Sequence, residues 1–223
     1  NPFNNLDIEK ALRSESVTMD HALLNKVRLY NNRIKTQQNN KTSIQGKTGH
    51  PQIKKTKTSN SSNTQQPILK SNNTAIQKLV IASDAATYIN DNDLITLVEL
   101  GFIHGKTRII NLAGCDRITK LNPLVSCTAL ESLDISFCDQ IIELSPLAHC
   151  TMLSSLNLTF CDQIKDFSAL SKCLALTNLD IGGCDQITDQ ILNQITSYAA
   201  VTSLRLAFSN QIRNLSHLKT TGH

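Results

Sequence analysis

Residues 137–141 read Phe-Cys-Asp-Gln-Ile, and the same five letters return at residues 160–164. Close copies stand at 114–118 (Gly-Cys-Asp-Arg-Ile), at 183–187 (Gly-Cys-Asp-Gln-Ile) and at 208–212 (Phe-Ser-Asn-Gln-Ile). Successive copies begin 23, 23, 23 and 25 residues apart. A fixed period of this size is the signature of a chain that stacks one structural unit several times.

The five copies share one apolar pattern, apolar-x-x-Leu-x-Leu-x-x-Cys-x-x-Ile, which in the second copy runs from Leu130 to Ile141. The Leu-x-Leu alternation predicts a short strand with one buried face. After the Ile, the pairs Asn122-Pro123 and Ser145-Pro146 predict a capped helical turn. One strand–turn–helix unit of this size cannot bury its apolar side alone, so neighbouring units must stack.

The repeats resemble leucine-rich repeats, and the Cys in the turn resembles the cysteine-containing, ribonuclease-inhibitor-like type. The short units around Leu144-Ser145-Pro146-Leu147 also resemble repeats seen in bacteria and protozoa. The resemblance covers about residues 107–220. It implies an α/β fold, a right-handed leucine-rich-repeat solenoid with short parallel strands on its concave face and short helices or 3-10 turns on its convex face. Only the fourth unit approaches the greater length that is usual for the cysteine-containing type.

Composition divides the chain into four parts. Residues 1–30 form a weakly helical N-terminal segment, either a functional helix or a segment that docks loosely or not at all. Residues 31–76 are rich in Asn, Gln, Ser and Lys and poor in apolar side chains, so we expect a disordered linker that cannot offset its chain entropy. Residues 77–106 form a helical N-terminal cap, whose second helix stops at Gly101. Residues 107–223 hold about five leucine-rich repeats.

Seven cysteines stand in two columns of the repeat, and the odd count argues against a complete set of disulfides. We interpret both columns as core, with each turn thiol donating to the backbone carbonyl of a neighbouring unit, and we expect Ser209 to do the same with its hydroxyl. Zinc is the alternative, but spacings of 11 and 12 residues do not gather four ligands and no Cys-x-x-Cys is present. Disulfides between repeats are not expected in a reducing compartment.

An aspartate follows the turn cysteine in four repeats, at Asp116, Asp139, Asp162 and Asp185. A column of acids suggests calcium, yet the loop lacks the glycine-rich, multi-oxygen design of calcium-binding repeats. We therefore expect each carboxylate to accept backbone N–H groups of its own turn.

The concave face of a solenoid is the usual binding surface. We expect a protein partner to bind ten residues there: Asn111, Asp134, Ser136, Phe137, Asn157, Thr159, Phe160, Asp180, Arg205 and Phe208. The phenylalanines either anchor the partner or tuck under the rim as extra core, and both interpretations remain open. Asp134 and Asp180 would attract a basic partner, for which one candidate is the linker's own Lys54, Lys55 and Lys57.

The sequence holds no phosphate-binding loop, no Gly-x-Ser-x-Gly and no His-Glu-x-x-His. We therefore expect no enzyme, no cofactor and no metal, but a non-catalytic protein–protein interaction module or scaffold. The alternative is the substrate-recognition subunit of an F-box-type ubiquitin ligase, bound to a ligase adaptor, since the resemblance allows an F-box that is missing or unrecognised in this sequence.

Charge and hydropathy indicate whether the chain binds nucleic acid or spans a membrane. Residues 21–83 carry 11 Lys or Arg and no acid, whereas residues 84–223 carry nine against 14 acids. The basic stretch has few aromatic residues, so nucleic-acid binding is not favoured. No apolar run is long enough to span a membrane. We expect the cytoplasm, with the nucleus as the alternative, because in a secreted protein Asn157-Leu158-Thr159 would be a glycan acceptor on the binding face.

Overall fold

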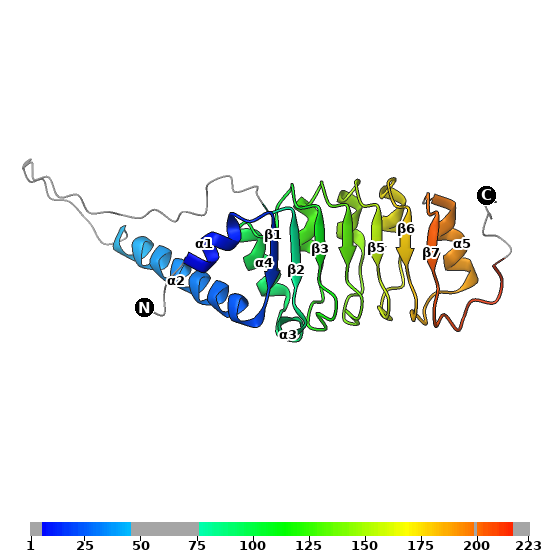
Figure 1. The fold of residues 1–223 in the computed structure, drawn as a ribbon, viewed down its shortest axis with the longest axis horizontal. Helices are drawn as coiled ribbons and strands as arrows, with labels where there is room; N and C mark the ends of the chain where they lie inside the picture. The colour runs from blue at the N-terminus through cyan, green and yellow to red at the C-terminus, as the bar shows by residue number, and fades with distance from the viewer. Residues whose placement is uncertain (1–5, 46–75, 199, 216–223) are drawn as a thin grey trace, which may run out of the picture.

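The computed structural model describes residues 6–45, 76–198 and 200–215. Seven short strands lie side by side in chain order and form one parallel sheet along the long axis of the molecule (Figure 1). The strands are β1 (Ser16–Met19), β2 (Lys78–Ile81), β3 (Ile109–Asn111), β4 (Ser132–Asp134), β5 (Ser155–Asn157), β6 (Asn178–Asp180) and β7 (Ser203–Arg205). The expected fold class, a leucine-rich-repeat solenoid, is confirmed.

The helices cover the other side of the sheet within the repeats. They are α4 (Asp91–Glu99), the 3-10 helices η2 (Asn122–Ser126), η3 (Ser145–His149) and η4 (Ser168–Lys172), and α5 (Asp189–Tyr198). Asn122, Ser145 and Ser168 are the first residues of the 3-10 helices, and the residues before them make no side-chain cap bond. The predicted side-chain caps are therefore wrong. Prolines favour the start of η2 and η3, whereas η4 has none.

The core consists of columns that run the length of the solenoid. Leu133 pairs in register with Ile110 on one side and Leu156 on the other, and all three are buried. The apolar positions of the repeat at Ile135, Cys138, Ile141, Leu144 and Leu147 are likewise buried. Each unit thus covers the apolar side of the next, as the period predicted.

Two strands extend the sheet beyond the repeats on the N-terminal side. β1 pairs with β2, and β2 pairs with β3 through Lys78 and Ile109. Residues 77–106, predicted as a helical cap, therefore contain a strand before α3 (Ser83–Ala86) and α4. Asn90 begins α4 with a capping box, in which its side chain accepts from the Asp93 N–H and the Asp93 carboxylate accepts from the Asn90 N–H.

The long helix α2 (His21–Gln45) and the short α1 (Leu6–Leu12) pack at the N-terminal end. The predicted linker is wrong over residues 31–45, which are helical. Arg28 binds the Asp93 carboxylate with two bonds of 2.7 and 2.6 Å, and the buried Asn31 amide donates to Thr96 Oγ1 at 2.9 Å. These contacts attach α2 to α4. The remainder of the predicted linker, with its Lys54, Lys55 and Lys57, lies outside the described residues.

Candidate functional site

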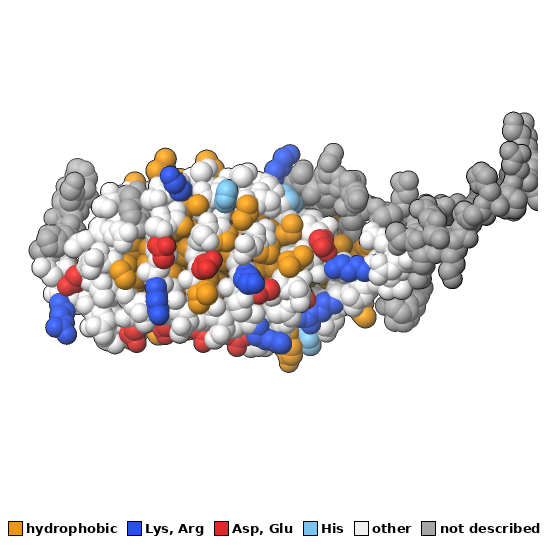
Figure 2. All heavy atoms as spheres, turned by 180° about the vertical axis from the view of Figure 1, so that it is seen from behind, with side chains coloured by type: hydrophobic (Ala, Val, Ile, Leu, Met, Phe, Trp, Pro, Cys, Tyr) orange, Lys and Arg blue, Asp and Glu red, His pale blue; other side chains and the backbone are white. Residues whose placement is uncertain are grey.

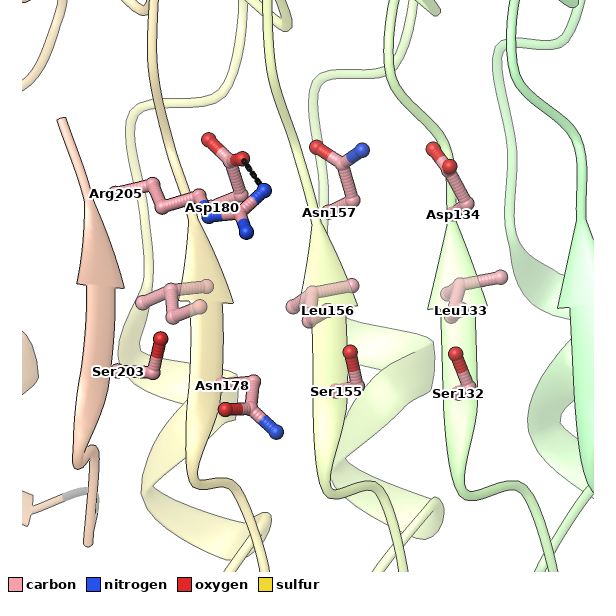
Figure 3. A pocket seen from close by; sticks show the side chains of 11 residues that line it. Ser132, Leu133, Asp134, Ser155, Leu156, Asn157, Asn178, Asp180, Ser203 and Arg205 are labelled. Atoms are coloured by element: carbon pink, nitrogen blue, oxygen red, sulfur yellow. Dashed lines mark ion pairs between the residues drawn. The ribbon is translucent and has the colours of Figure 1, made fainter. Parts of the chain in front are cut away.

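The exposed side of the sheet presents two rows of side chains, which we call the strand face. The rows are Ile109, Ser132, Ser155, Asn178 and Ser203, and Asn111, Asp134, Asn157, Asp180 and Arg205. Between β4 and β7 these rows line a shallow depression of about 340 Å³ (Figure 3). The structure thus brings five of the ten predicted site residues into one row.

Four members of that row bind their own chain. Asn111, Asp134 and Asn157 each accept, through Oδ1, the N–H of the residue two positions on, at 2.9, 2.9 and 3.0 Å, and Asp180 does the same at 3.1 Å. Such Asx contacts hold the side chain in one orientation. The second oxygen or the amide nitrogen still points to the open side, so the row is a preorganised set of polar groups.

Two other predicted site residues support this row. The Ser136 hydroxyl donates to Asp134 Oδ1 at 2.7 Å, and the Thr159 hydroxyl donates to Asn157 Oδ1 at 2.6 Å. Ser136 is buried, so it positions Asp134 and does not itself meet a partner. Arg205 is largely exposed and lies 3.9 Å from Asp180 Oδ2, as the dashed line in Figure 3 marks.

The three remaining predicted residues form a second feature, which we call the aromatic row. The Phe137 and Phe160 rings stack with centroids 5.0 Å apart, and the Phe160 and Phe208 rings stack at 6.1 Å. Phe137 is 55% exposed and Phe208 is 72% exposed. Phe137 and Phe208 therefore do not tuck into the core, whereas Phe160, between them, is half-buried.

All three phenylalanines have a left-handed backbone, with φ of 59°, 57° and 59°. Left-handed backbone costs a side-chain-bearing residue about 1–2 kcal/mol. The same position in the first and fourth repeats is Gly114, with φ of 75°, and Gly183, with φ of 68°. The sequence contains this signal, since glycine and phenylalanine share one column of the repeat.

The fourth repeat has a glycine, Gly183, in the column of the aromatic row, and the Phe160 ring packs over it. A Cβ on Gly183 would lie 2.5 Å from Phe160 Cε1 and 2.6 Å from Cδ1. The Phe160 ring therefore lies over the glycine and reaches toward Phe208, two repeats further on. The backbone holds the row rigidly, because the Phe137 and Phe160 N–H groups still donate to the next repeat, at 2.8 and 2.9 Å.

The turn cysteines form a ladder of S–H···O contacts, as predicted. Cys138, Cys161 and Cys184 lie 3.2, 3.1 and 3.1 Å from the backbone carbonyl oxygens 26 residues earlier. All seven thiols are free and buried. Burial raises the pKa of Cys138 to about 12 and that of Cys184 to about 11, so these thiols stay protonated at neutral pH.

Two expectations about the turns are wrong. The Ser209 hydroxyl is buried and has no hydrogen-bond partner among the described residues. Among the aspartates that follow the cysteines, Asp162 accepts from the Asp185 N–H of the next repeat at 3.4 Å and not from its own turn. Instead, the aspartate or asparagine that ends the strand accepts the backbone N–H two positions further on.

The described residues offer neither a metal site nor a membrane-spanning helix. No three His, Cys, Asp or Glu side chains gather there in a way that could hold a metal ion. No helix of the described ranges is long and apolar enough to cross a bilayer. Apolar side chains do gather on the helix side of the solenoid (Figure 2), where Val125 of η2 is 37% exposed.

Comparison with known proteins agrees with the repeat. A family model described as Leucine Rich repeat matches residues 149–166. The match covers part of one repeat of the chain, and the period and the parallel sheet agree with it. No curated protein matches the chain.

Three solved structures, all from Listeria monocytogenes, are similar to the chain. Internalin C2 is 23% identical with a TM-score of 0.49, over 68% of this chain and 60% of its own length. Internalin InlF is 18% identical with a TM-score of 0.39, over 67% of this chain and 53% of its own. The functional domain of InlJ, which is described as including a cysteine ladder, is 13% identical with a TM-score of 0.30, over 64% and 41%. The chain thus spans less than two thirds of each of these structures.

Proposed function

We propose that this chain is a non-catalytic interaction module that binds a protein partner across the strand face and the aromatic row. The observation that carries the proposal is the aromatic row itself, three rings on left-handed backbone, of which Phe137 and Phe208 are exposed and Phe160 is half-buried. Strain that persists at an exposed position, where no core packing demands it, is typical of a functional surface. Aromatic side chains are also the residues that most often dominate the free energy of binding at protein interfaces.

The strand face supports the proposal through its rigidity. A partner loses less free energy on binding when the groups that it contacts are already ordered. The Asx contacts of Asp134 and Asn157, at 2.9 and 3.0 Å, order these side chains before any partner arrives. The aromatic row lies at the carboxyl end of the same strands, so one extended partner can contact both features.

The ubiquitin-ligase alternative finds no specific support. An F-box needs a helical segment that is free to bind the ligase adaptor. In the described residues 6–45, α1, β1 and α2 instead pack at the N-terminal end of the sheet, and Leu24 and Val27 of α2 are buried there. We therefore retain the interaction module as the proposal, and treat capture of ligase adaptors as an outcome of its test.

The test is affinity capture with the full chain from the cells of its source. The variant Phe137→Asn/Phe208→Asn removes two rings. It introduces asparagine, which tolerates the left-handed backbone of these positions. The matched control Val125→Asn changes an exposed apolar side chain on the helix side. A protein retained by wild type and control but lost with the phenylalanine variant supports the proposal. Equal capture by all three chains, with circular dichroism unchanged, would refute it.

A further inference from the structure

Carboxylates flank the aromatic row on both sides. Asp134 and Asp180 lie on the strand side, in the row that the sheet register defines. The turn side carries one aspartate in each of the four repeats that have the cysteine, and three of these aspartates, Asp116, Asp139 and Asp185, are exposed. The exposed rings therefore stand in a strip that is lined with negative charge.

The electrostatics of the buried thiol beside Phe137 place these charges close to the row. Burial is the main reason that the pKa of the Cys138 thiol is raised to about 12, and the charges of Asp134, Asp116 and Asp139 raise it in the same direction. The negative charges of three carboxylates thus act on the residue that follows Phe137 in the chain. Farther along, Asp162 and Asp180 act on Cys184 in the same way.

Few cations offset these charges. Arg205 stands in the strand-side row and approaches Asp180, and Arg117 stands in the turn after Asp116. Six aspartates therefore face two arginines along the two sides of the row. The strip keeps a negative charge that only a cationic partner would complement.

The ring faces at the ends of the row are open. Phe137 is covered by Phe160 on one side, but the position before it in the column is Gly114. A Cβ on Gly114 would meet nothing nearer than Ala86 Cβ at 3.8 Å. The position next to Phe137 on this side of the column thus carries no side chain of its own, and a Cβ there would meet no clash.

We propose that the aromatic row binds the guanidinium groups of an extended, arginine-containing segment of a partner protein. This inference rests on the proposed function and names the chemistry of its partner. Aromatic faces attract cations, and arginine stacks on them while it donates to carboxylates. The row from Gly114 to Phe208 crosses four strand spacings, or about 19 Å, which an extended segment of about six residues spans.

The probe is a fluorescein-labelled octapeptide of alternating Arg and Ser, titrated with the full chain and followed by fluorescence anisotropy at 50 mM NaCl. Matched peptides carry citrulline, Lys or Glu in place of Arg. Citrulline keeps the planar shape but lacks the charge, and Lys keeps the charge but lacks the plane. The protein variants are Phe137→Asn/Phe208→Asn, and Asp134→Asn/Asp139→Asn. Asp134→Asn keeps the Asx acceptor, since Asn157 makes the same contacts naturally in the next repeat.

We expect the Arg peptide to bind more tightly than the Lys peptide, and the citrulline and Glu peptides not to bind. The phenylalanine variant should weaken binding of the Arg peptide about tenfold, which corresponds to two exposed cation–π contacts. The aspartate variant should weaken it about fivefold, and 500 mM NaCl should remove that difference. The control Val125→Asn should leave the affinity unchanged.

Two results would overturn the inference. Equal binding of Arg and Lys peptides that does not depend on the phenylalanines would mean a diffuse attraction of charges and no site. Absence of Arg-peptide binding would also refute it. In the second case, a cellular partner that still requires Phe137 and Phe208 would leave the proposed interaction module intact, with a partner of different chemistry.

Discussion

Gly183→Ala tests the structure of the aromatic row most directly, because Gly114 provides a matched control. Both glycines have left-handed backbone, with φ of 68° and 75°. A Cβ on Gly183 would lie 2.5 Å from the Phe160 ring, whereas a Cβ on Gly114 would have its nearest neighbour at 3.8 Å. The two substitutions thus share the backbone penalty and differ only in the clash.

The magnitude follows from these contacts. Left-handed alanine costs about 1–2 kcal/mol at either position. At position 183 the Phe160 ring must also leave its rotamer, which costs about 0.5–1.5 kcal/mol. It then loses its stacking on Phe208, a contact that contributes about 0.5–1.5 kcal/mol. We expect Gly183→Ala to lower the free energy of unfolding by about 1–3 kcal/mol more than Gly114→Ala does.

The assay is urea unfolding of the full chain, followed by far-ultraviolet circular dichroism, with the slopes required to match between variants. A second pair of variants carries each glycine substitution in a Phe160→Ala background. There the two substitutions should cost the same, because the ring that distinguishes them is gone. Equal losses in the wild-type background, or an excess at position 183 that persists without the ring, would refute the packing that we describe.

Further predictions concern the cysteine ladder, the N-terminal helix and the strain. The Cys138 Sγ donates to the Leu112 carbonyl at 3.2 Å, so Cys138→Ala should lower the free energy of unfolding by about 1–2 kcal/mol. Because burial raises the pKa of Cys138 from 9.0 to about 12, only the unfolded thiol ionises just above pH 9, and stability should fall by about 1.4 kcal/mol per thiol for each further pH unit. Thermal unfolding from pH 8 to 10.5 measures this fall, which should be shallower in Cys138→Ala. Arg28→Met removes both bonds to the Asp93 carboxylate and should cost about 1.5–3 kcal/mol in urea unfolding, and an unchanged midpoint would show that α2 contributes nothing. Phe208→Gly relieves left-handed strain at a side chain that is 72% exposed, so it should leave stability unchanged or higher while weakening capture of the partner.

The repeat could be predicted from the sequence because each unit sees the same surroundings. A residue type that recurs every 23 positions occupies one column, and its role in one unit applies to the others. The cysteines are the clearest example, since Cys138 and Cys161 make the same contact with a carbonyl 26 residues earlier. Ser209 departs from the rule, since its hydroxyl has no hydrogen-bond partner among the described residues.

The N-terminal elements could not be predicted from local pattern. β1 has only four residues, and it is a strand because β2 pairs with it, some 62 residues later in the chain. The polar residues 31–45 read as a linker, yet they continue a helix that tertiary contacts support. Arg28 and Asn31 each bind a residue 65 positions away, in α4. Composition carries no information about such distant partners.

The positions of the site residues could be predicted, but the backbone on which the phenylalanines stand could not. Strand alternation placed Asp134 and Asn157 on the exposed side, where they lie. The turn position of Phe137 requires left-handed backbone, which glycine or asparagine adopts at little cost, and the chain itself uses Gly114 and Gly183 in the same column. Stability alone would favour a small residue there, since an exposed ring regains little of the strain through burial. The exposed Phe137 and Phe208 gain little from contacts within the chain, and this is the physical reason to look for a partner at the aromatic row.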